Sequence, residues 1–189
     1  TGAEVWNFSR GGMTAYEYCE SFAAENGFWD PKYHAQAYIL ALGVNDLFND
    51  AVARPLGSIA DIDWQDWRNN RDTFAGTYAQ IVQRLRENHS SVKFFFMSMP
   101  RDDRDTEQKA AVREAHTKLL YALSELVPNS YVLDFYRFAP MQDSRFRQLY
   151  YLNGHLNPCG YLLTAQMVVS YLDYIIRHNM EDFRLSGLL

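Results

Sequence analysis

The chain of 189 residues is 48% hydrophobic and 15% aromatic, which suits one domain with a full core and excludes a disordered chain. Its net charge is −5 and its lysines and arginines are scattered, which argues against binding to nucleic acid or to an anionic membrane. Two cysteines without a CxxC motif exclude a disulfide framework. No uncharged apolar stretch reaches about 18 residues, so we expect no membrane-spanning segment.

The first part of the chain predicts a strand, a helix and a second strand. Residues 4–9 indicate a short strand. Thr14 is a suitable cap for a helix that reaches about Asn26, and Gly27 is a natural stop. Residues 37–42 form a continuous apolar run, which is typical of a strand buried on both faces.

The rest of the chain continues this alternation of helical spacing and short apolar runs. Pro100 ends one apolar run, Thr106 can cap a helix, and Pro158 fits a first helical turn. We expect an irregular segment over 47–66, helices over 67–88, 106–126 and 158–178, strands over 92–99 and 131–135, and a loop over 136–154.

Strands that alternate with helices and are apolar throughout predict a parallel sheet covered by helices on both faces. In such folds ligands bind beyond the carboxyl ends of the strands. The polar residues that follow the predicted strands are therefore expected at one rim of a single domain over residues 1–189. They are Gly11 and Gly12, Asn45 and Asp46, Arg101 and Asp102, Asp134, and His155.

These residue types suit ester hydrolysis, which needs a nucleophile, a base and donors for the developing oxyanion. Gly12 offers a backbone N–H that no Cβ obstructs, Asn45 offers a neutral NH₂ donor, and His155 offers an imidazole base. Asp46 is a candidate substrate contact. Arg10 could meet a carboxylate of the substrate or form a salt bridge.

Three motifs resemble conserved blocks of the SGNH (GDSL-type) hydrolases. Residues 7–14 (NFSRGGMT) resemble the second block, residues 43–46 (GVND) match the third, and His155 followed by Asn157-Pro158 and Gly160-Tyr161 resembles the fifth. The resemblance implies a flavodoxin-like three-layer α/β/α fold with a mostly parallel sheet, and chemistry without a metal or an organic cofactor. It also implies that Gly12 and Asn45 are oxyanion donors and that His155 is the base.

The first block of that family, Gly-Asp-Ser, carries the nucleophile and has no counterpart here. Ser9 lies within the second block, Ser58 follows no predicted strand, and Cys159 is a rival nucleophile that would crowd His155 in one helical turn. By resemblance, the absent strand lies inside the sheet between residues 4–9 and 37–42. Unpaired strand groups there would cost about 1–3 kcal/mol each. We therefore expect an N-terminally incomplete domain without its first strand, or another segment that fills the gap.

The triad acid also departs from the family pattern, which places Asp three residues before the histidine. Leu152 occupies that position, and the neighbouring Asn153 is neutral. Asp134 is a possible substitute, and a backbone carbonyl would make a Ser-His dyad instead.

The resulting hypothesis is a serine ester hydrolase that removes an acetyl-type acyl group from a carbohydrate or a small ester, with its nucleophile outside this segment. Its alternatives are a non-catalytic relative that binds a glycan or a partner, and an acyltransferase. No nucleic acid, membrane, metal or cofactor is expected as a partner, and oligomeric state and localisation stay open.

Overall fold

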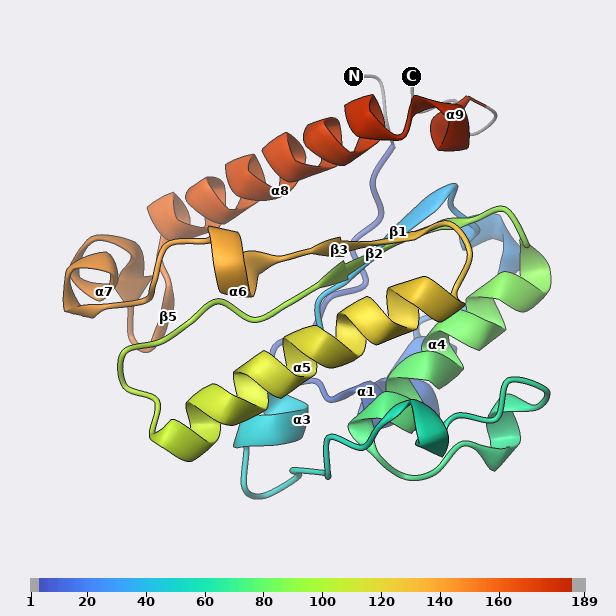
Figure 1. Ribbon diagram of the computed structural model, residues 1–189, viewed down its shortest axis with the longest axis horizontal. Coiled ribbons are helices and arrows are strands. Elements are labelled where there is room, and N and C mark those ends of the chain that lie inside the picture. Colours follow the sequence, from blue (N-terminus) through green and yellow to red (C-terminus); the bar gives the residue numbers. More distant parts are fainter. Residues whose placement is uncertain (1–3, 185–189) are drawn as a thin grey trace. The chain divides into compact units, whose positions relative to one another are not determined.

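The computed structural model describes residues 4–184 (Figure 1). The chain divides into two compact units, Thr1–Phe94 and Phe95–Leu189. β1 (Ala37–Leu40), β2 (Lys93–Met97) and β3 (Ser130–Leu133) form a three-stranded parallel sheet in the order β1-β2-β3. Parallel neighbours need crossover connections, and the chain contains helices between consecutive strands. The predicted flavodoxin-like α/β class is confirmed.

The first helical segment begins and ends where the sequence predicts. Thr14 and Glu17 form a capping box, and Gly27 follows the last turn with a positive φ of 69°. The segment comprises α1 (Ala15–Glu17), a π-helical stretch (Tyr18–Phe22) and α2 (Ala23–Glu25).

Residues 4–9 form no strand, so that prediction is wrong. The segment packs through aromatic rings instead. Trp6 meets Tyr33 edge-on with ring centroids 5.0 Å apart, and Phe8 meets Phe28 at 5.0 Å. A strand needs a neighbour to pair its N–H and C=O groups, and β1, an edge of the sheet within residues 4–184, has only β2 beside it.

The helix predicted over 67–88 begins only at Phe74, because polar contacts hold the preceding residues in a 3₁₀ turn and a loop. A 3₁₀ turn covers Trp67–Asn69, and α4 (Phe74–Asn88) starts after the N-cap Thr73, whose hydroxyl accepts the Gly76 N–H at 3.2 Å. α3 (Val44–Phe48) overlaps the first residues of the predicted irregular segment 47–66, which also contains a second 3₁₀ turn (Ile59–Asp61). A further 3₁₀ turn (Pro31–Tyr33) precedes β1.

In the second unit, α5 (Glu107–Leu126) starts at the predicted cap Thr106. The expected loop over 136–154 is wrong, because α6 (Phe135–Phe138), α7 (Ser144–Tyr150) and the short strand β4 (Tyr151–Leu152) fill most of it. Asp134 and Asp143 cap these two helices. The helices are too short for their hydrophobic residues to show a helical period in the sequence. β5 (His155–Leu156), α8 (Pro158–His178) and α9 (Met180–Phe183) follow.

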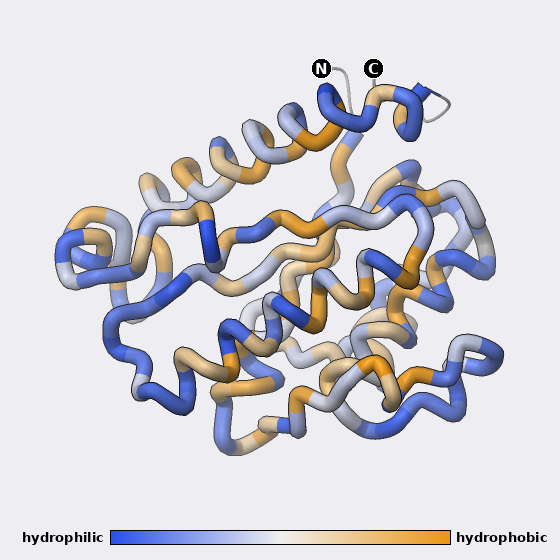
Figure 2. Tube along the Cα trace, viewed as in Figure 1, coloured by the Kyte–Doolittle hydropathy of each residue, from blue (hydrophilic) through white to orange (hydrophobic). Residues whose placement is uncertain are grey.

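Each unit buries its own apolar side chains, and the hydrophobic colours of Figure 2 gather on the strands and on one side of α4 and α5. Burying each large side chain contributes about 1.5–3 kcal/mol. The most buried in the first unit are Phe74, Tyr78, Ile81, Val82 and Phe94, and in the second they are Phe96, Leu120, Leu123, Leu133 and Phe183.

Helix α8 is unusually exposed for its composition. Gly160 and Ile175 are its buried residues, whereas Leu162 and Val169 are 61% and 64% exposed. Among the described helices, α8 alone is long and apolar enough to cross a membrane, by length and composition only. Asp173 interrupts the uncharged residues of α8, so its sequence contains no uncharged apolar stretch of about 18 residues.

Gly76 tests whether packing outweighs helix propensity at the start of α4. A Cβ at Gly76 would lie 2.1 Å from the Arg71 carbonyl oxygen, which belongs to the backbone and cannot move aside easily. Gly76→Ala should therefore lower the free energy of unfolding by about 1–3 kcal/mol, as overpacking does. Urea unfolding measures the change.

Gly11→Ala is the matched control, because a Cβ there meets nothing within 4 Å. Its effect should stay within about 0.5 kcal/mol. A Gly76→Ala protein that is more stable, by the roughly 1 kcal/mol that helix propensity alone favours, would contradict the packing argument.

Candidate active site

The first unit brings the two predicted oxyanion donors to one place. Gly12 lies on an exposed turn with a φ of 78°, and nothing lies within 4 Å of where its Cβ would be. The Asn45 side chain donates to the carbonyl of Met13, the next residue, at 3.1 Å. An amide carries two N–H groups, so this bond orients Asn45 and leaves its second N–H for another acceptor. Both groups are neutral donors, and their joint role in holding one oxyanion stays a prediction.

Asp46 holds these two segments together. Its side chain is 1% exposed, and Oδ1 accepts the Ala15 N–H at 2.7 Å. Oδ2 is buried and has no hydrogen-bond partner among the described residues. Burial raises the pKa of the Asp46 carboxyl, although the Ala15 N–H opposes the rise. Asp46 therefore links the first turn of α3 to the start of α1, and its role as a substrate contact stays a prediction.

Arg10 lies beside the same turn and faces an aromatic ring. Its guanidinium carbon is 5.6 Å from the centroid of Phe22, within the range of a cation–π contact. The residue is exposed, so its charge is accessible to a ligand. Its predicted contact with a substrate carboxylate stays a prediction.

In the second unit, His155 lies on a β-hairpin and not at the start of the helix. β4 and β5 pair antiparallel, with Leu152 opposite His155 and Tyr151 opposite Leu156. Asn153 and Gly154 form the two-residue turn with φ values of 51° and 84°, the geometry that Asn-Gly favours. That Asn-Gly pair is the signal by which the sequence would have revealed the hairpin. His155 is exposed, and no described side chain hydrogen-bonds its ring.

The hairpin register shows what His155 lacks because Leu152 stands where the family pattern has an aspartate. The residue three positions before His155 is its direct cross-strand neighbour, and such side chains share one face with Cβ atoms about 4.5–5.5 Å apart. An acidic residue there would lie beside the imidazole. Leu152, which is 62% exposed, offers no charge and no acceptor.

Asp134 follows β3, as predicted, and is fully engaged in other contacts. It is 1% exposed and caps α6 by accepting the Arg137 N–H at 2.8 Å. It also accepts the Ser98 hydroxyl at 3.4 Å and the Tyr121 hydroxyl at 3.0 Å. Burial and then the bond to Asp134 raise the pKa of the Tyr121 hydroxyl, which therefore remains a donor. The carboxylate anchors the end of β3 to α5 and α6, and its role as the triad acid stays a prediction.

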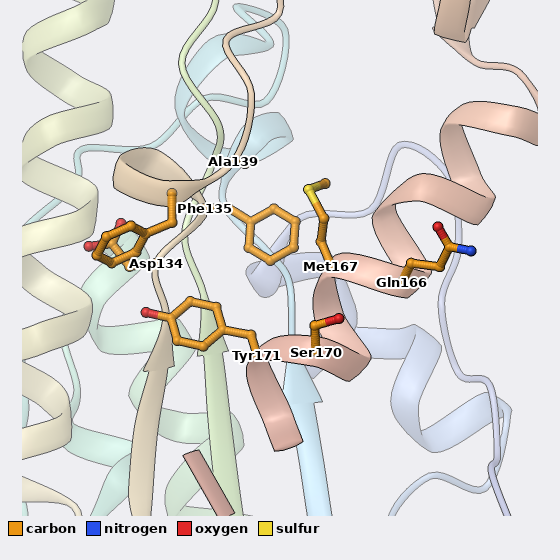
Figure 3. Close-up of a pocket in the computed structure, with 8 residues that line it drawn as sticks. Asp134, Phe135, Ala139, Gln166, Met167, Ser170 and Tyr171 are labelled. Atoms are coloured by element: carbon orange, nitrogen blue, oxygen red, sulfur yellow. The ribbon is translucent and has the colours of Figure 1, made fainter. Parts of the chain in front are cut away.

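A cavity of about 370 Å³ lies between α6 and α8 in the second unit. In Figure 3, Phe135 and Met167 point toward each other across it, and Tyr171 lies along its edge. A second cavity of about 160 Å³ shares Phe135 and Met167 with the first and reaches Leu156 of the hairpin. Apolar side chains form most of both linings, so these spaces suit apolar groups better than charged ones.

Ser9, Ser58, Ser98, Cys19 and Cys159 have no activating base beside them among the described residues, whereas the Ser91 hydroxyl oxygen lies 3.2 Å from Nδ1 of His89 at the exposed turn before β2. Ser58 caps a 3₁₀ turn, and the Ser98 hydroxyl is buried against Asp134. Cys19 is buried, and burial raises the pKa of its thiol to about 12, which keeps it protonated at neutral pH. Ser9 and Cys159 are exposed but have no hydrogen-bonded base beside them in the described contacts. No group of three or more His, Cys, Asp and Glu within residues 4–184 could hold a metal ion.

Comparison with known proteins gives a structural likeness without a close relative. No protein-family profile matches the chain, and no curated protein matches it. A serine-to-alanine mutant of an acetyl esterase, solved with an acetate ion, is similar with a TM-score of 0.51 at 17% identity, over 88% of this chain and 70% of that one. A carbohydrate esterase of family 3 from Talaromyces cellulolyticus gives a TM-score of 0.49 at 19% identity, over the same shares. The acetyl esterase shows that the chain has an SGNH-hydrolase-like fold.

The raised pKa of Asp46 makes a pH-dependent contribution to stability. The native carboxyl keeps its proton to higher pH than the unfolded chain, whose value is near the ordinary 3.8. The native state therefore binds more protons in that window, and stability falls as pH rises through it. Asp46→Asn should remove this fall, as measured by urea unfolding from about pH 3 to pH 7.

Asp63→Asn is the control with the opposite sign. Hydrogen bonds from the Asn69 side chain and from the Gln65 and Asp66 N–H groups lower the pKa of Asp63. Ionisation of Asp63 therefore makes the folded protein more stable as pH rises, and the Asp63→Asn variant should lack this increase. Identical pH slopes for the wild type and Asp46→Asn would show that Asp46 titrates normally.

The hairpin register predicts the effect of restoring an acid at position 152. Leu152→Asp should place a carboxylate beside His155 and move the titration of its ring to higher pH, because an adjacent negative charge favours the imidazolium. NMR of the imidazole protons measures the midpoint. Leu149→Asp is the control, since Leu149 is 56% exposed on α7, outside the hairpin. Equal shifts in both variants would contradict the cross-strand contact.

Proposed function

We propose that this chain supplies the oxyanion donors and the base of a serine ester hydrolase that removes a short, acetyl-type acyl group from a carbohydrate or a small ester. The observation that carries the proposal is the bond from Asn45 to the Met13 carbonyl, which sets a neutral amide donor beside the open turn at Gly12. The acetyl esterase of similar fold supports the choice of an acyl ester as substrate. The sequence resemblance to the SGNH hydrolases, whose members include carbohydrate deacetylases, supports the choice of a carbohydrate.

The proposed reaction uses a serine from outside residues 1–189. Its hydroxyl oxygen attacks the ester carbonyl carbon while His155 accepts the hydroxyl proton. The carbonyl oxygen becomes an oxyanion and accepts hydrogen bonds from the Gly12 N–H and the Asn45 amide. The intermediate then expels the alcohol, which takes the proton from His155. Water repeats the sequence on the acyl-serine and releases the carboxylic acid.

An acyl ester assay on the native polypeptide that contains these residues tests the proposal. It should hydrolyse 4-nitrophenyl acetate. Asn45→Ala should lower kcat by about 10²–10³-fold, which is the usual cost of losing one oxyanion donor. His155→Gln should lower it at least as far. Residues 1–189 alone should show no turnover above the buffer rate.

Asn49→Ala and His178→Gln are the matched controls. Asn49 is exposed at the end of α3 and His178 is exposed at the end of α8, so both should leave kcat unchanged. Strong hydrolysis by residues 1–189 that survives Ser9→Ala would place the nucleophile elsewhere in this chain. A native polypeptide without hydrolysis would favour the non-catalytic binding relative. Preferred transfer of the acetyl group to an added alcohol would favour the acyltransferase.

A further inference from the structure

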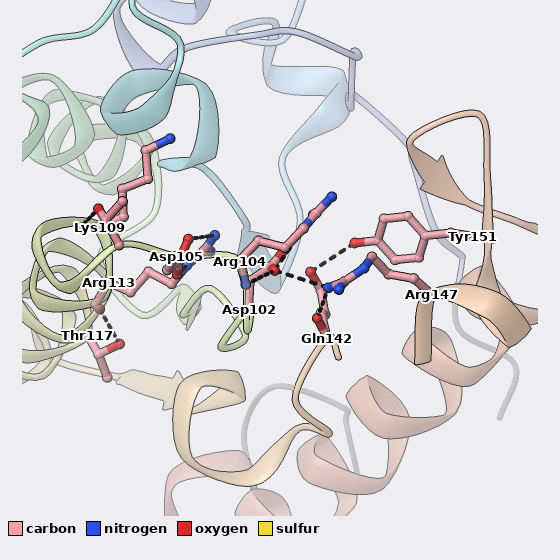
Figure 4. A network of polar contacts seen from close by, with 10 residues as sticks. Asp102, Arg104, Asp105, Lys109, Arg113, Thr117, Gln142, Arg147 and Tyr151 are labelled. Carbon is pink, nitrogen blue, oxygen red and sulfur yellow. Dashed lines mark hydrogen bonds and ion pairs between the residues drawn. The ribbon is translucent and has the colours of Figure 1, made fainter. Parts of the chain in front are cut away.

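A network of polar contacts joins three segments at the foot of the hairpin that carries His155 (Figure 4). Gln142 is its centre. Its backbone N–H donates to the Arg101 carbonyl at 2.8 Å, and its side-chain oxygen accepts the Tyr151 hydroxyl at 2.8 Å. Its carbonyl accepts a hydrogen bond from Arg147. One residue thus ties the loop after β2, helix α7 and the first hairpin strand together.

Arg147 is the half-buried cation of this network. Its side chain is 19% exposed, and Nη1 and Nη2 lie 3.2 Å from Asp102 and 2.7 Å from Asp103. Asp102 is 6% exposed and is also held by Arg104, which keeps the pKa of that carboxyl low and the group ionised. A planar guanidinium with several donors can hold two carboxylates and a carbonyl at once, whereas an ammonium cannot hold the same fork.

These contacts lead directly into the hairpin. α7 ends at Tyr150, and β4 begins at the next residue. The Tyr150 carbonyl accepts the Asn157 N–H at 2.7 Å, and the Asn157 side chain donates to the Leu149 carbonyl at 2.9 Å. The residues before and after the hairpin are therefore bonded to each other, and the earlier side is fixed to the loop after β2 through Arg147.

We propose that Arg147, with Gln142 and Tyr151, forms a positioning network that holds the hairpin of His155 in place for proton transfer. The proposal rests on the function proposed for His155. A base has to lie within hydrogen-bond reach of the proton it accepts, and His155 has no described side chain to orient its ring. The hairpin backbone therefore positions His155, and the contacts of Arg147 hold the hairpin in place.

Hydrogen exchange on residues 1–189 tests whether Arg147 holds the hairpin, and it needs no measurement of enzymatic activity. Arg147→Met keeps most of the apolar stem and removes the charge. The Asn157 amide should then exchange at least about tenfold faster, while the amides of α5 keep their rates. Arg177→Met is the matched control, because its ion pair with Asp173 at 2.8 Å is solvent-exposed. Arg147→Lys should restore part of the protection.

An unchanged Asn157 rate in folded Arg147→Met would overturn the proposal, and so would equal acceleration throughout α5. If Arg147→Met does not fold, Tyr151→Phe decides the question, because it removes only the hydroxyl bond to Gln142. It should accelerate Asn157 alone by a smaller factor, and an unchanged rate would overturn the proposal.

Kinetics of the native polypeptide test the catalytic consequence. Arg147→Met should lower kcat about tenfold or more with KM unchanged, since a misplaced base affects the chemical step more than binding. Faster exchange with an unchanged kcat would overturn the positioning role. A native polypeptide without esterase activity would refute the proposed function, while the exchange rates would still decide whether Arg147 holds the hairpin.

Discussion

The bond from the Ala15 N–H to the buried Asp46 carboxylate sets the geometry on which the two proposed oxyanion donors depend. Asp46 lies in the first turn of α3, directly after Asn45, and Ala15 is the first residue of α1. An N–H at the start of a helix has no partner within that helix, so a carboxylate satisfies it and also meets the positive end of the helix dipole. With these two helix starts joined, the Asn45 amide reaches the Met13 carbonyl and stands beside Gly12. Moving Asp46 would therefore separate the two donors.

His155, the proposed base, depends on a different constraint, the turn at Asn153 and Gly154. Both residues have positive φ, a conformation that glycine adopts freely and asparagine tolerates better than most residues. This turn fixes the register that sets Leu152 opposite His155. Because successive side chains in a strand alternate between faces, a shift of one residue would turn the imidazole to the other face. Two residues thus decide where the ring of His155 points, and the contacts of Arg147 decide where the hairpin as a whole lies.

Much of this could be predicted from local signals. The caps at Thr14 and Thr106, the stop at Gly27 and the length of α8 follow from helix-end chemistry, which acts within a few residues. The pattern of residues 4–9 predicts a strand that does not form, because a strand needs a neighbouring strand to pair with, and six residues of sequence do not show whether one is there. Helical spacing predicts too early a start for α4, because the Asn70 side chain bridges the Gly76 carbonyl and Gln83, and helix propensity does not report such a contact. The engagement of Asp134 by Tyr121 and Ser98 likewise required the tertiary structure.

The identity of the group that orients His155 follows from competition between contacts. Asp134 already accepts three hydrogen bonds in the core of the second unit, so turning toward an imidazole would leave the Tyr121 hydroxyl or the α6 N-terminus without its partner. Each such loss costs about 1–3 kcal/mol, while a hydrogen bond typically contributes a net gain of only about 1 kcal/mol. Leu152, the cross-strand neighbour, offers neither a charge nor an acceptor. Asp134 and Leu152 thus give the proposed base no carboxylate partner, which leaves the orientation of its ring to the backbone. A ring held in that way depends on the rigidity of its support, and this is why a largely buried arginine eight residues earlier in the chain matters to the chemistry of His155.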